Sequence, residues 1–129
     1  MALETEDLRL DDATLREGVA AILSDPAKGM YYLVEEGGVT CAQMMITLEW
    51  SDWRNAQMWW IQSVYTHPGH RRRGHFKALY RHVEQAGKAE GAGGLRLYVD
   101  NANLRAQETY RAMGMKTHYA LYEDLFTDY

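Results

Sequence analysis

The chain has 129 residues, the length of one ordinary domain, and 47% of them are hydrophobic, which is enough to build a folded core. Its formal net charge is −4 and its pI is about 5.7, whereas nucleic-acid-binding domains usually carry a basic excess or a basic face. No apolar run approaches the roughly 20 residues that cross a bilayer, and the acidic N-terminal residues are unlike a signal peptide. We therefore expect one cytoplasmic domain over residues 1–129, with no membrane or nucleic-acid partner.

The first half of the chain predicts one helix followed by three strands. Residues 11–24 place apolar side chains at helical spacing behind an aspartate cap. Residues 30–50 form two runs rich in β-branched and aromatic side chains around Gly37 and Gly38, a pair that tolerates the positive φ of a tight hairpin turn. A polar turn then leads to residues 58–66, which predict a third strand apolar enough to be central in a sheet.

The second half predicts helices that alternate with strands. Apolar side chains recur at helical spacing from residue 76 to residue 86, and residues 95–99 predict a short strand. Another helix, capped by the loop before it, ends at Gly114, and residues 115–126 have strand character. The order predicts an α/β layer fold in which an antiparallel hairpin half joins a strand–helix–strand crossover.

The stretch "HRRRGHF", residues 70–76, concentrates positive charge where the third strand leads into a helix. The first N–H groups of a helix lack partners within the helix, and the aligned peptide dipoles favour an anion there. Gly74 lets a ligand approach the backbone and three arginines add charge, which predicts a phosphate or pyrophosphate site. The alternative is that the arginines are solvated and Gly74 only eases the start of the helix. The sequence lacks the Lys-Ser/Thr pair of a Walker-type loop and two of the three glycines of a dinucleotide fingerprint.

Two patterns occur in order along this region. In the first, Arg71, Gly74 and Phe76 fit a loop written Arg/Gln-x-x-Gly-x-Gly/Ala, with Phe76 in place of a small residue. The second is an Asn-x-x-Ala-x-x-x-Tyr-x-x-x-Gly-Phe run, matched except for a final methionine by Asn103, Ala106, Tyr110, Gly114 and Met115. Together they resemble the acyl-CoA-binding core of the GNAT superfamily of N-acetyltransferases. The resemblance implies a mixed, mostly antiparallel central sheet with helices on both faces, without the usual N-terminal strand and most of the first helix.

The resemblance also implies a reaction and a binding site. An acetyl group would pass from acetyl-CoA directly to a primary amine of a small molecule or peptide. The pantetheine arm would bind the strand end formed by Val64, Tyr65 and Thr66, and Asn103 and Ala106 would lie beside it. The pyrophosphate would bind the loop residues Arg71, Arg72, Arg73, Gly74, His75 and Phe76. The Phe76 ring is expected to point into the core while its N–H faces the ligand.

For catalysis, the resemblance implies that Tyr110 is the general acid for the departing CoA thiolate, a role typically worth about 10²–10⁴-fold in rate. Helical periodicity alone makes Tyr110 a core aromatic instead. The base is not marked by a motif. Glu49 is the candidate base, Asp52 is another nearby carboxylate, and a water chain is an alternative. Gln62 occupies the strand on which some relatives carry an acid.

Other residues carry weaker signals. Cys41 is the single cysteine and predicts a small buried core thiol without a disulfide. No metal is expected. Four tryptophans flank one turn and are either core residues or the walls of an acceptor pocket: Trp50, Trp53, Trp59 and Trp60.

Compared with the family, residues 1–8 resemble only the tail of a first helix. The strand at residues 30–35 is then expected to be an exposed sheet edge, which proteins normally cover or pair. We therefore expect a second subunit to cover a gap, in a homodimer. The alternative to an enzyme is a non-catalytic module that binds or senses acyl-CoA.

Overall fold

The computed structural model describes residues 11–71 and 73–127. The chain divides into two compact units. The larger unit is Asp12–Leu97, and the smaller unit combines Met1–Asp11 with Tyr98–Tyr129. The expected helix tail at residues 1–8 lies outside the described residues. Across the described ranges, no helix is long and apolar enough to cross a membrane.

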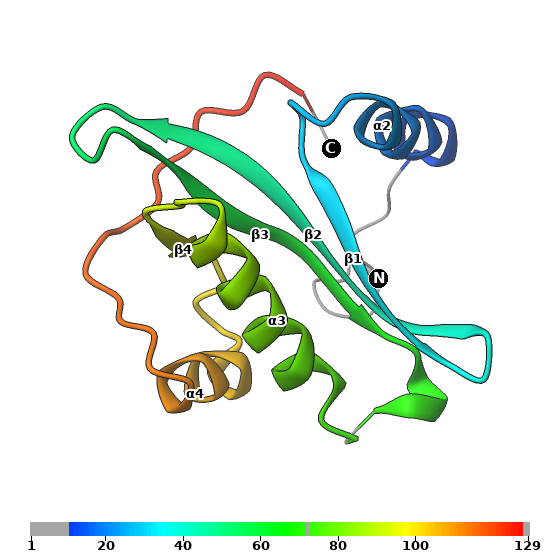
Figure 1. Ribbon diagram of the computed structural model, residues 1–129. Helices are drawn as coiled ribbons and strands as arrows, with labels where there is room; N and C mark the ends of the chain where they lie inside the picture. Colours follow the sequence, from blue (N-terminus) through cyan, green and yellow to red (C-terminus); the bar gives the residue numbers. More distant parts are fainter. Residues whose placement is uncertain (1–10, 72, 128–129) are drawn as a thin grey trace. The chain divides into compact units, whose positions relative to one another are not determined.

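The larger unit is built on a four-stranded sheet with the order β1-β2-β3-β4 (Figure 1). The three strands β1 (Met30–Glu36), β2 (Val39–Ser51) and β3 (Ala56–Thr66) pair antiparallel, and β4 (Gly94–Arg96) runs parallel to β3. The sheet is therefore mixed and mostly antiparallel, as predicted. Among the described residues, β1 lies at one edge of this sheet, where we expected an edge strand.

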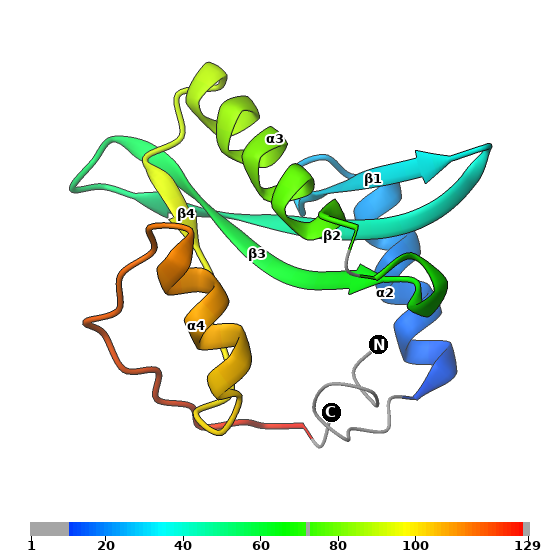
Figure 2. The ribbon, with the colours of Figure 1, turned by 90° about the horizontal axis from the view of Figure 1, so that it is seen from below.

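Two helices of the larger unit lie on opposite faces of the sheet (Figure 2). α2 (Asp12–Ser24) packs beside β1, and none of its residues is fully buried. α3 (His75–Ala89) is strongly amphipathic and buries Leu79, Tyr80 and Val83 against the sheet. The prediction of helices on both faces is confirmed, and the main core lies under α3.

That core is supplied mostly by the two middle strands. The buried side chains are Cys41, Ala42, Met44 and Ile46 from β2 and Met58, Trp59 and Ile61 from β3. β3 is therefore as central as its apolar sequence predicted. Burial of such apolar side chains stabilises the fold by about 25 cal/mol for each Å² removed from water.

Two bulges interrupt the pairing of the strands. Val34 pairs with Ala42 and Glu35 pairs with Thr40, so that Cys41 has no residue opposite it on β1. Such an extra residue bends the strand and changes the direction of its side chain. Because of this bulge, Cys41 and Ala42 are adjacent in the chain and both buried.

The second bulge is in β3. Met45 pairs with Ser63 and Ile46 pairs with Ile61, which leaves Gln62 unpaired in the register. The Gln62 amide Nε2 instead donates a hydrogen bond to Thr47 Oγ1 at 3.0 Å.

The parallel pairing of β3 with β4 is short. β4 pairs only with residues 58–60, whereas β3 continues to Thr66. Within the larger unit, residues 61–66 of β3 therefore have a strand partner only on the β2 side.

The smaller unit contains α4 (Leu104–Ala112). Asn103 caps this helix, because its side-chain oxygen accepts from the Ala106 N–H at 3.1 Å. After Gly114, which has φ +97°, the chain forms no strand through residue 127. The predicted strand at 115–126 is therefore wrong for the described residues. A strand needs a paired neighbour, and this segment instead leaves large apolar side chains exposed: Tyr119, Leu121, Tyr122, Leu125 and Phe126.

Candidate functional site

The chain passes from β3 to α3 through a 3₁₀ turn, Pro68–His70, and then through Gly74. Gly74 is the N-cap of α3, has φ +77° and makes no side-chain capping hydrogen bond. A Cβ added at Gly74 would meet nothing within 4 Å. The left-handed backbone conformation at position 74 therefore favours glycine over other residues, and the space beside Gly74 is open to a ligand.

A cavity of about 180 Å³ opens at this helix N-terminus. Two of its lining residues, Arg71 and Lys77, carry positive charge. The structure brings five of the predicted binding residues around this cavity, namely Thr66, Arg71, Gly74, His75 and Phe76, and adds His70 and Lys77. Sequence reasoning missed Lys77, although its place in the first turn of α3 was a usable signal.

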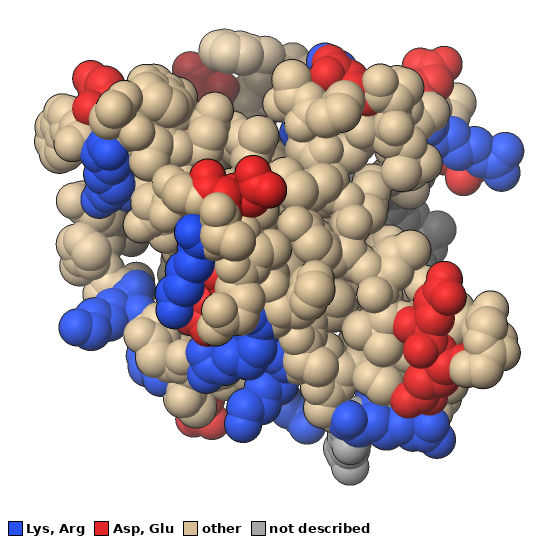
Figure 3. Space-filling model, in the orientation of Figure 1, with Lys and Arg blue, Asp and Glu red and all other residues tan. Residues whose placement is uncertain are grey.

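The three adjacent arginines do not have the same surroundings. Arg71 Nε donates to the Thr66 carbonyl at 3.0 Å, and its guanidinium lies 5.9 Å from the centroid of the Tyr65 ring. Arg73 Nη1 instead contacts Glu36 Oε2 at 3.1 Å. Arg72 lies outside the described residues. On the face shown in Figure 3, lysine and arginine side chains lie among acidic ones.

Phe76, which replaces a small residue of the loop pattern, lies at the border of the core and the cavity. Its side chain is half-buried, and its ring centroid is 6.3 Å from that of Tyr80. Phe76 also lines the 180 Å³ cavity. The sequence led us to expect the Phe76 ring in the core, but the ring lies only partly there.

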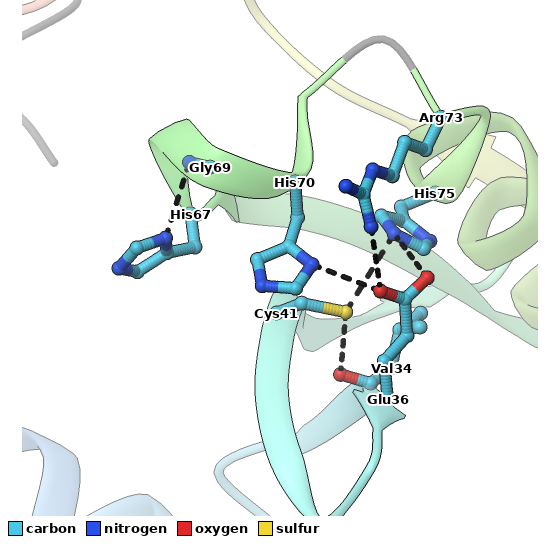
Figure 4. Close-up of polar contacts among 8 residues, drawn as sticks. All are labelled: Val34, Glu36, Cys41, His67, Gly69, His70, Arg73 and His75. Atoms are coloured by element: carbon cyan, nitrogen blue, oxygen red, sulfur yellow. Dashed lines mark hydrogen bonds and ion pairs between the residues drawn. The ribbon is translucent and has the colours of Figure 1, made fainter.

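A polar cluster lies beside the loop (Figure 4). The two oxygens of Glu36 contact different histidines, with Oε2 at 2.9 Å from His70 Nδ1 and Oε1 at 3.1 Å from His75 Nε2. The hydrogen bond from His70 lowers the pKa of the Glu36 carboxyl, and the charges of His75 and Arg73 act in the same direction, while desolvation opposes them. The His75 imidazole is therefore engaged with Glu36.

Cys41 completes this cluster. Its side chain is buried, as predicted, and its Sγ lies 3.3 Å from the Val34 carbonyl oxygen. The same Sγ lies 3.7 Å from His75 Nε2. The thiol thus has a histidine as neighbour, which its place in an apolar strand did not predict.

Glu49, the candidate base, forms an ion pair with Arg96. Arg96 Nη1 lies 2.6 Å from Glu49 Oε1, and the side chains are 30% and 45% exposed. The other carboxylate considered, Asp52, accepts a hydrogen bond from the Trp53 N–H in the β2–β3 turn. Glu49 is therefore paired with an arginine side chain, and Asp52 is held in a turn.

Val64 lies on β3 in the larger unit, and three further predicted residues lie on or beside α4 in the smaller unit. Asn103 is the N-cap, and Ala106 and Tyr110 follow at helical spacing. Residues four apart in a helix lie on the same face. Tyr110 is partly buried, and this burial raises the pKa of its hydroxyl.

The tryptophans separate into core and surface. Trp59 is buried, whereas Trp53 is 89% exposed. Trp50 and Trp59 line a second cavity of the larger unit, of about 470 Å³, at the far end of α3. In the wall of this cavity, Gln57 Oε1 is buried and has no hydrogen-bond partner. Two of the four tryptophans therefore wall a cavity.

Comparison with known proteins supports one family. A model of the Acetyltransferase (GNAT) family matches residues 2–115. No curated protein matches this chain. Among solved structures, a possible acetyltransferase from Clostridium difficile 630 is 40% identical with a TM-score of 0.91, and the match covers 98% of this chain and 84% of that chain.

Two other solved structures share the fold at low identity. A ribosomal-protein-alanine N-acetyltransferase from Brucella melitensis biovar Abortus 2308 is 15% identical with a TM-score of 0.73, over 85% of this chain and 80% of that chain. An aminoglycoside acetyltransferase from an uncultured soil metagenomic sample is 13% identical with a TM-score of 0.77, over 98% and 80%. Because their names give different acceptors, the fold does not select one.

Proposed function

Because this chain belongs to the GNAT family of acetyltransferases, we propose that it transfers an acetyl group from acetyl-CoA directly to a primary amine. Acyl transfer is the chemistry of the family. The use of acetyl-CoA, and a small molecule or peptide as the acceptor, are our proposal. The single observation that carries it is the open N-terminus of α3 with Gly74, Arg71 and Lys77 around it.

This helix N-terminus fits the pyrophosphate of CoA. The N–H groups of a helix's first turn and the helix dipole favour an anion, and Gly74 leaves room for one. Arg71 and Lys77 add two cationic side chains at the same cavity. The backbone N–H groups of His75 and Phe76 belong to the first turn of α3 and would face the phosphates. Arg73 would contribute mainly long-range charge, because Glu36 already contacts it.

The stretch of β3 that continues beyond its pairing with β4 is the proposed binding site of the pantetheine arm. Its amides would bind along the edge of residues 61–66 as an added strand does, through backbone groups of Val64, Tyr65 and Thr66. Thr66 also lines the cavity at the α3 N-terminus. The two parts of the proposed site therefore meet at the end of β3.

In the proposed reaction, acetyl-CoA supplies an activated thioester. The amine nitrogen forms a bond to the thioester carbonyl carbon, and the carbon–sulfur bond breaks. We propose that Tyr110 donates its proton to the departing sulfur and that Asn103 and Ala106 contact the pantetheine arm. Burial raises the pKa of this hydroxyl above its ordinary value, so the group carries a proton to donate at neutral pH. The amine loses its proton to Glu49 or to water. Arg96 contacts one oxygen of Glu49, and a carboxylate has two.

The function is tested by calorimetric titration with acetyl-CoA and CoA, followed by a thiol-release assay against a panel of amines. We expect binding of both ligands and release of thiol with at least one class of amine. Binding without turnover would favour the alternative, a non-catalytic acyl-CoA-binding module, for which the Glu49–Arg96 ion pair is the specific support. Absence of binding would contradict both functions.

We also propose a homodimer formed through the edge of β1. This strand has β2 on one side only in the described sheet, and Leu33 on it is 52% exposed. Pairing of two such edges would satisfy their backbone groups. Sedimentation equilibrium should give about twice the chain mass of 14.9 kDa. A single species of monomer mass at high concentration would contradict the dimer.

A further inference from the structure

The polar cluster beside the loop at residues 71–74 has the composition of a metal site. Glu36, Cys41, His70 and His75 each offer one ligand atom, and these four atoms all lie within 4.8 Å of one another (Figure 4). We propose that these four residues bind one divalent metal ion, with Zn²⁺ as the best chemical match. The sequence led us to expect no metal, and the structure argues for one through side chains that are distant along the chain.

Three distances between donor atoms are close to those of tetrahedral coordination. Ligands at about 2.0–2.3 Å from a tetrahedral Zn²⁺ lie about 3.3–3.6 Å from one another. His75 Nε2 is 3.1 Å from Glu36 Oε1 and 3.7 Å from Cys41 Sγ. His70 Nδ1 is 2.9 Å from Glu36 Oε2. Small side-chain adjustments would therefore place a common ion among them.

Hydrogen bonding alone explains this arrangement less well. The Nε2 atom of an imidazole carries either one hydrogen or one lone pair. In His75 this single atom faces both the Glu36 carboxylate and the Cys41 sulfur. A cation at the centre would interact with all three groups at once. Cys41 and His75 are 1% and 9% exposed, so their polar atoms are largely removed from competing water.

The donor set selects the kind of metal. One thiolate, two imidazoles and one carboxylate in a tetrahedral arrangement suit Zn²⁺, whereas Mg²⁺ and Ca²⁺ prefer oxygen ligands throughout. Arg73 contacts Glu36 Oε2 at 3.1 Å and would orient the carboxylate from outside the site. The Cys41 sulfur now lies near the Val34 carbonyl oxygen, and its thiol proton would be released when the metal binds.

The positions of the ligands give the site a structural consequence. Glu36 ends β1 and Cys41 is the bulged residue of β2, while His70 and His75 precede and follow the segment 71–74. The two pairs read Glu-x₄-Cys and His-x₄-His, and the second spacing is common among zinc ligands. With four protein ligands the site is closed. A bound metal ion would hold both ends of the segment 71–74 against the β1–β2 hairpin.

Metal binding is tested on the full chain after the protein has been stripped with a chelator. Titration with Zn²⁺ should show about one equivalent bound and a rise in Tm. Titration with Co²⁺ should give the visible absorption of a tetrahedral ion together with a near-ultraviolet band from thiolate coordination. Absence of stoichiometric metal binding would overturn the proposal. This readout needs no CoA and is therefore independent of the proposed acetyl transfer.

The variants separate a true site from surface binding. His70→Ala is the primary variant, because His70 is half-buried and its loss is tolerated more easily than that of buried Cys41 or His75. It should lose stoichiometric binding. His67→Ala is the matched control, since His67 is exposed, lies three residues earlier and is outside the cluster. Equal binding by the two variants would overturn the proposal. Cobalt bound by the wild type without the thiolate band would overturn the four-ligand assignment.

Discussion

Arg71 and Arg73 are two residues apart, yet their side chains contact different parts of the larger unit. Arg71 lines the cavity at the start of α3 and contacts the end of β3. Arg73 contacts Glu36 at the end of β1. Arg71 therefore lies at the proposed anion site, whereas Arg73 lies against a carboxylate outside that cavity.

We predict that Arg71→Ala weakens CoA binding by about tenfold or more, because a hydrogen bond to a charged group contributes about 1.5–3 kcal/mol. Binding of S-acetylpantetheine, which lacks the pyrophosphate, should hardly change. Calorimetric titration measures both. The control is Arg81→Ala, since Arg81 is an exposed residue of α3 paired with Glu84 and away from the cavity. Equal losses for CoA and S-acetylpantetheine would contradict the loop assignment.

Tyr110→Phe tests the proposed acid. The change removes one hydroxyl and keeps the ring, so we expect kcat to fall by about 10²–10⁴-fold while the affinity for CoA stays nearly the same. Steady-state kinetics and titration separate the two effects. An unchanged kcat would remove Tyr110 as the acid and leave it as a packing residue of α4.

The pH dependence follows from the same hydroxyl. Burial raises the pKa of Tyr110 above its ordinary value of 10.0, so the folded state holds this proton more tightly than the unfolded state does. The contribution to stability is present below the unfolded pKa and is lost as pH rises through the folded pKa. The proton needed for catalysis is lost over the same upper range. In a pH profile of kcat, a limb assigned to Tyr110 should lie above pH 10 and disappear in Tyr110→Phe. Such a limb near neutral pH would contradict the assignment.

At the scale of elements, α3 connects the core to the loop at residues 71–74. Its apolar face buries Leu79 and Val83, and Gly87 lies near Trp59 at its far end. A Cβ added at Gly87 would lie 3.6 Å from the Trp59 ring and from the Ala92 Cβ, which is ordinary van der Waals contact. The glycine in this helix is therefore not required by space.

We predict that Gly87→Ala stabilises the protein by about 0.5–1 kcal/mol, because glycine inside a helix is less favourable than alanine by that amount. Denaturant unfolding measures the free energy. Gly29→Ala is the contrasting variant, since Gly29 has φ +148° and a Cβ there would collide with the Ile46 carbonyl oxygen. It should be clearly destabilised. A loss of stability in Gly87→Ala would show that α3 and Trp59 leave no room for the methyl group.

At the scale of the whole molecule, the arginine-rich segment belongs to a chain with a net charge of −4. Several basic side chains pair with carboxylates, including Arg16 with Asp12, Arg73 with Glu36 and Arg96 with Glu49. Such pairs leave less positive charge for a polyanion. Binding of nucleic acid depends on many phosphate contacts and falls steeply with salt.

We therefore predict no measurable binding of a short DNA or RNA duplex at physiological salt, under conditions in which CoA still binds. Fluorescence anisotropy with a labelled duplex is the measurement, and CoA titration of the same sample shows that the protein is folded. Duplex binding that weakens as salt rises would identify the loop as a polyanion surface instead.

Much of the fold could be predicted from local patterns. The apolar periodicity of residues 76–86 predicted α3, and the pair Gly37-Gly38 predicted the β1–β2 hairpin, because these signals act between residues close in the chain. The strand predicted at 115–126 was wrong, because a sequence with strand character forms a strand only where a second strand is available to pair with it. The motifs around Gly74 and Tyr110 were enough to indicate the family.

The sequence alone therefore determined the order of the elements from α2 to α4 and the helix N-terminus at Gly74. Only the tertiary structure decided the partner of each side chain around it. Glu36 and His70 are 34 residues apart, and they meet because the β1–β2 hairpin folds beside the end of β3. The bulge at Cys41 places a thiol in the same cluster. Helix and strand preferences act over a few residues, whereas such convergence depends on strand register and long-range packing.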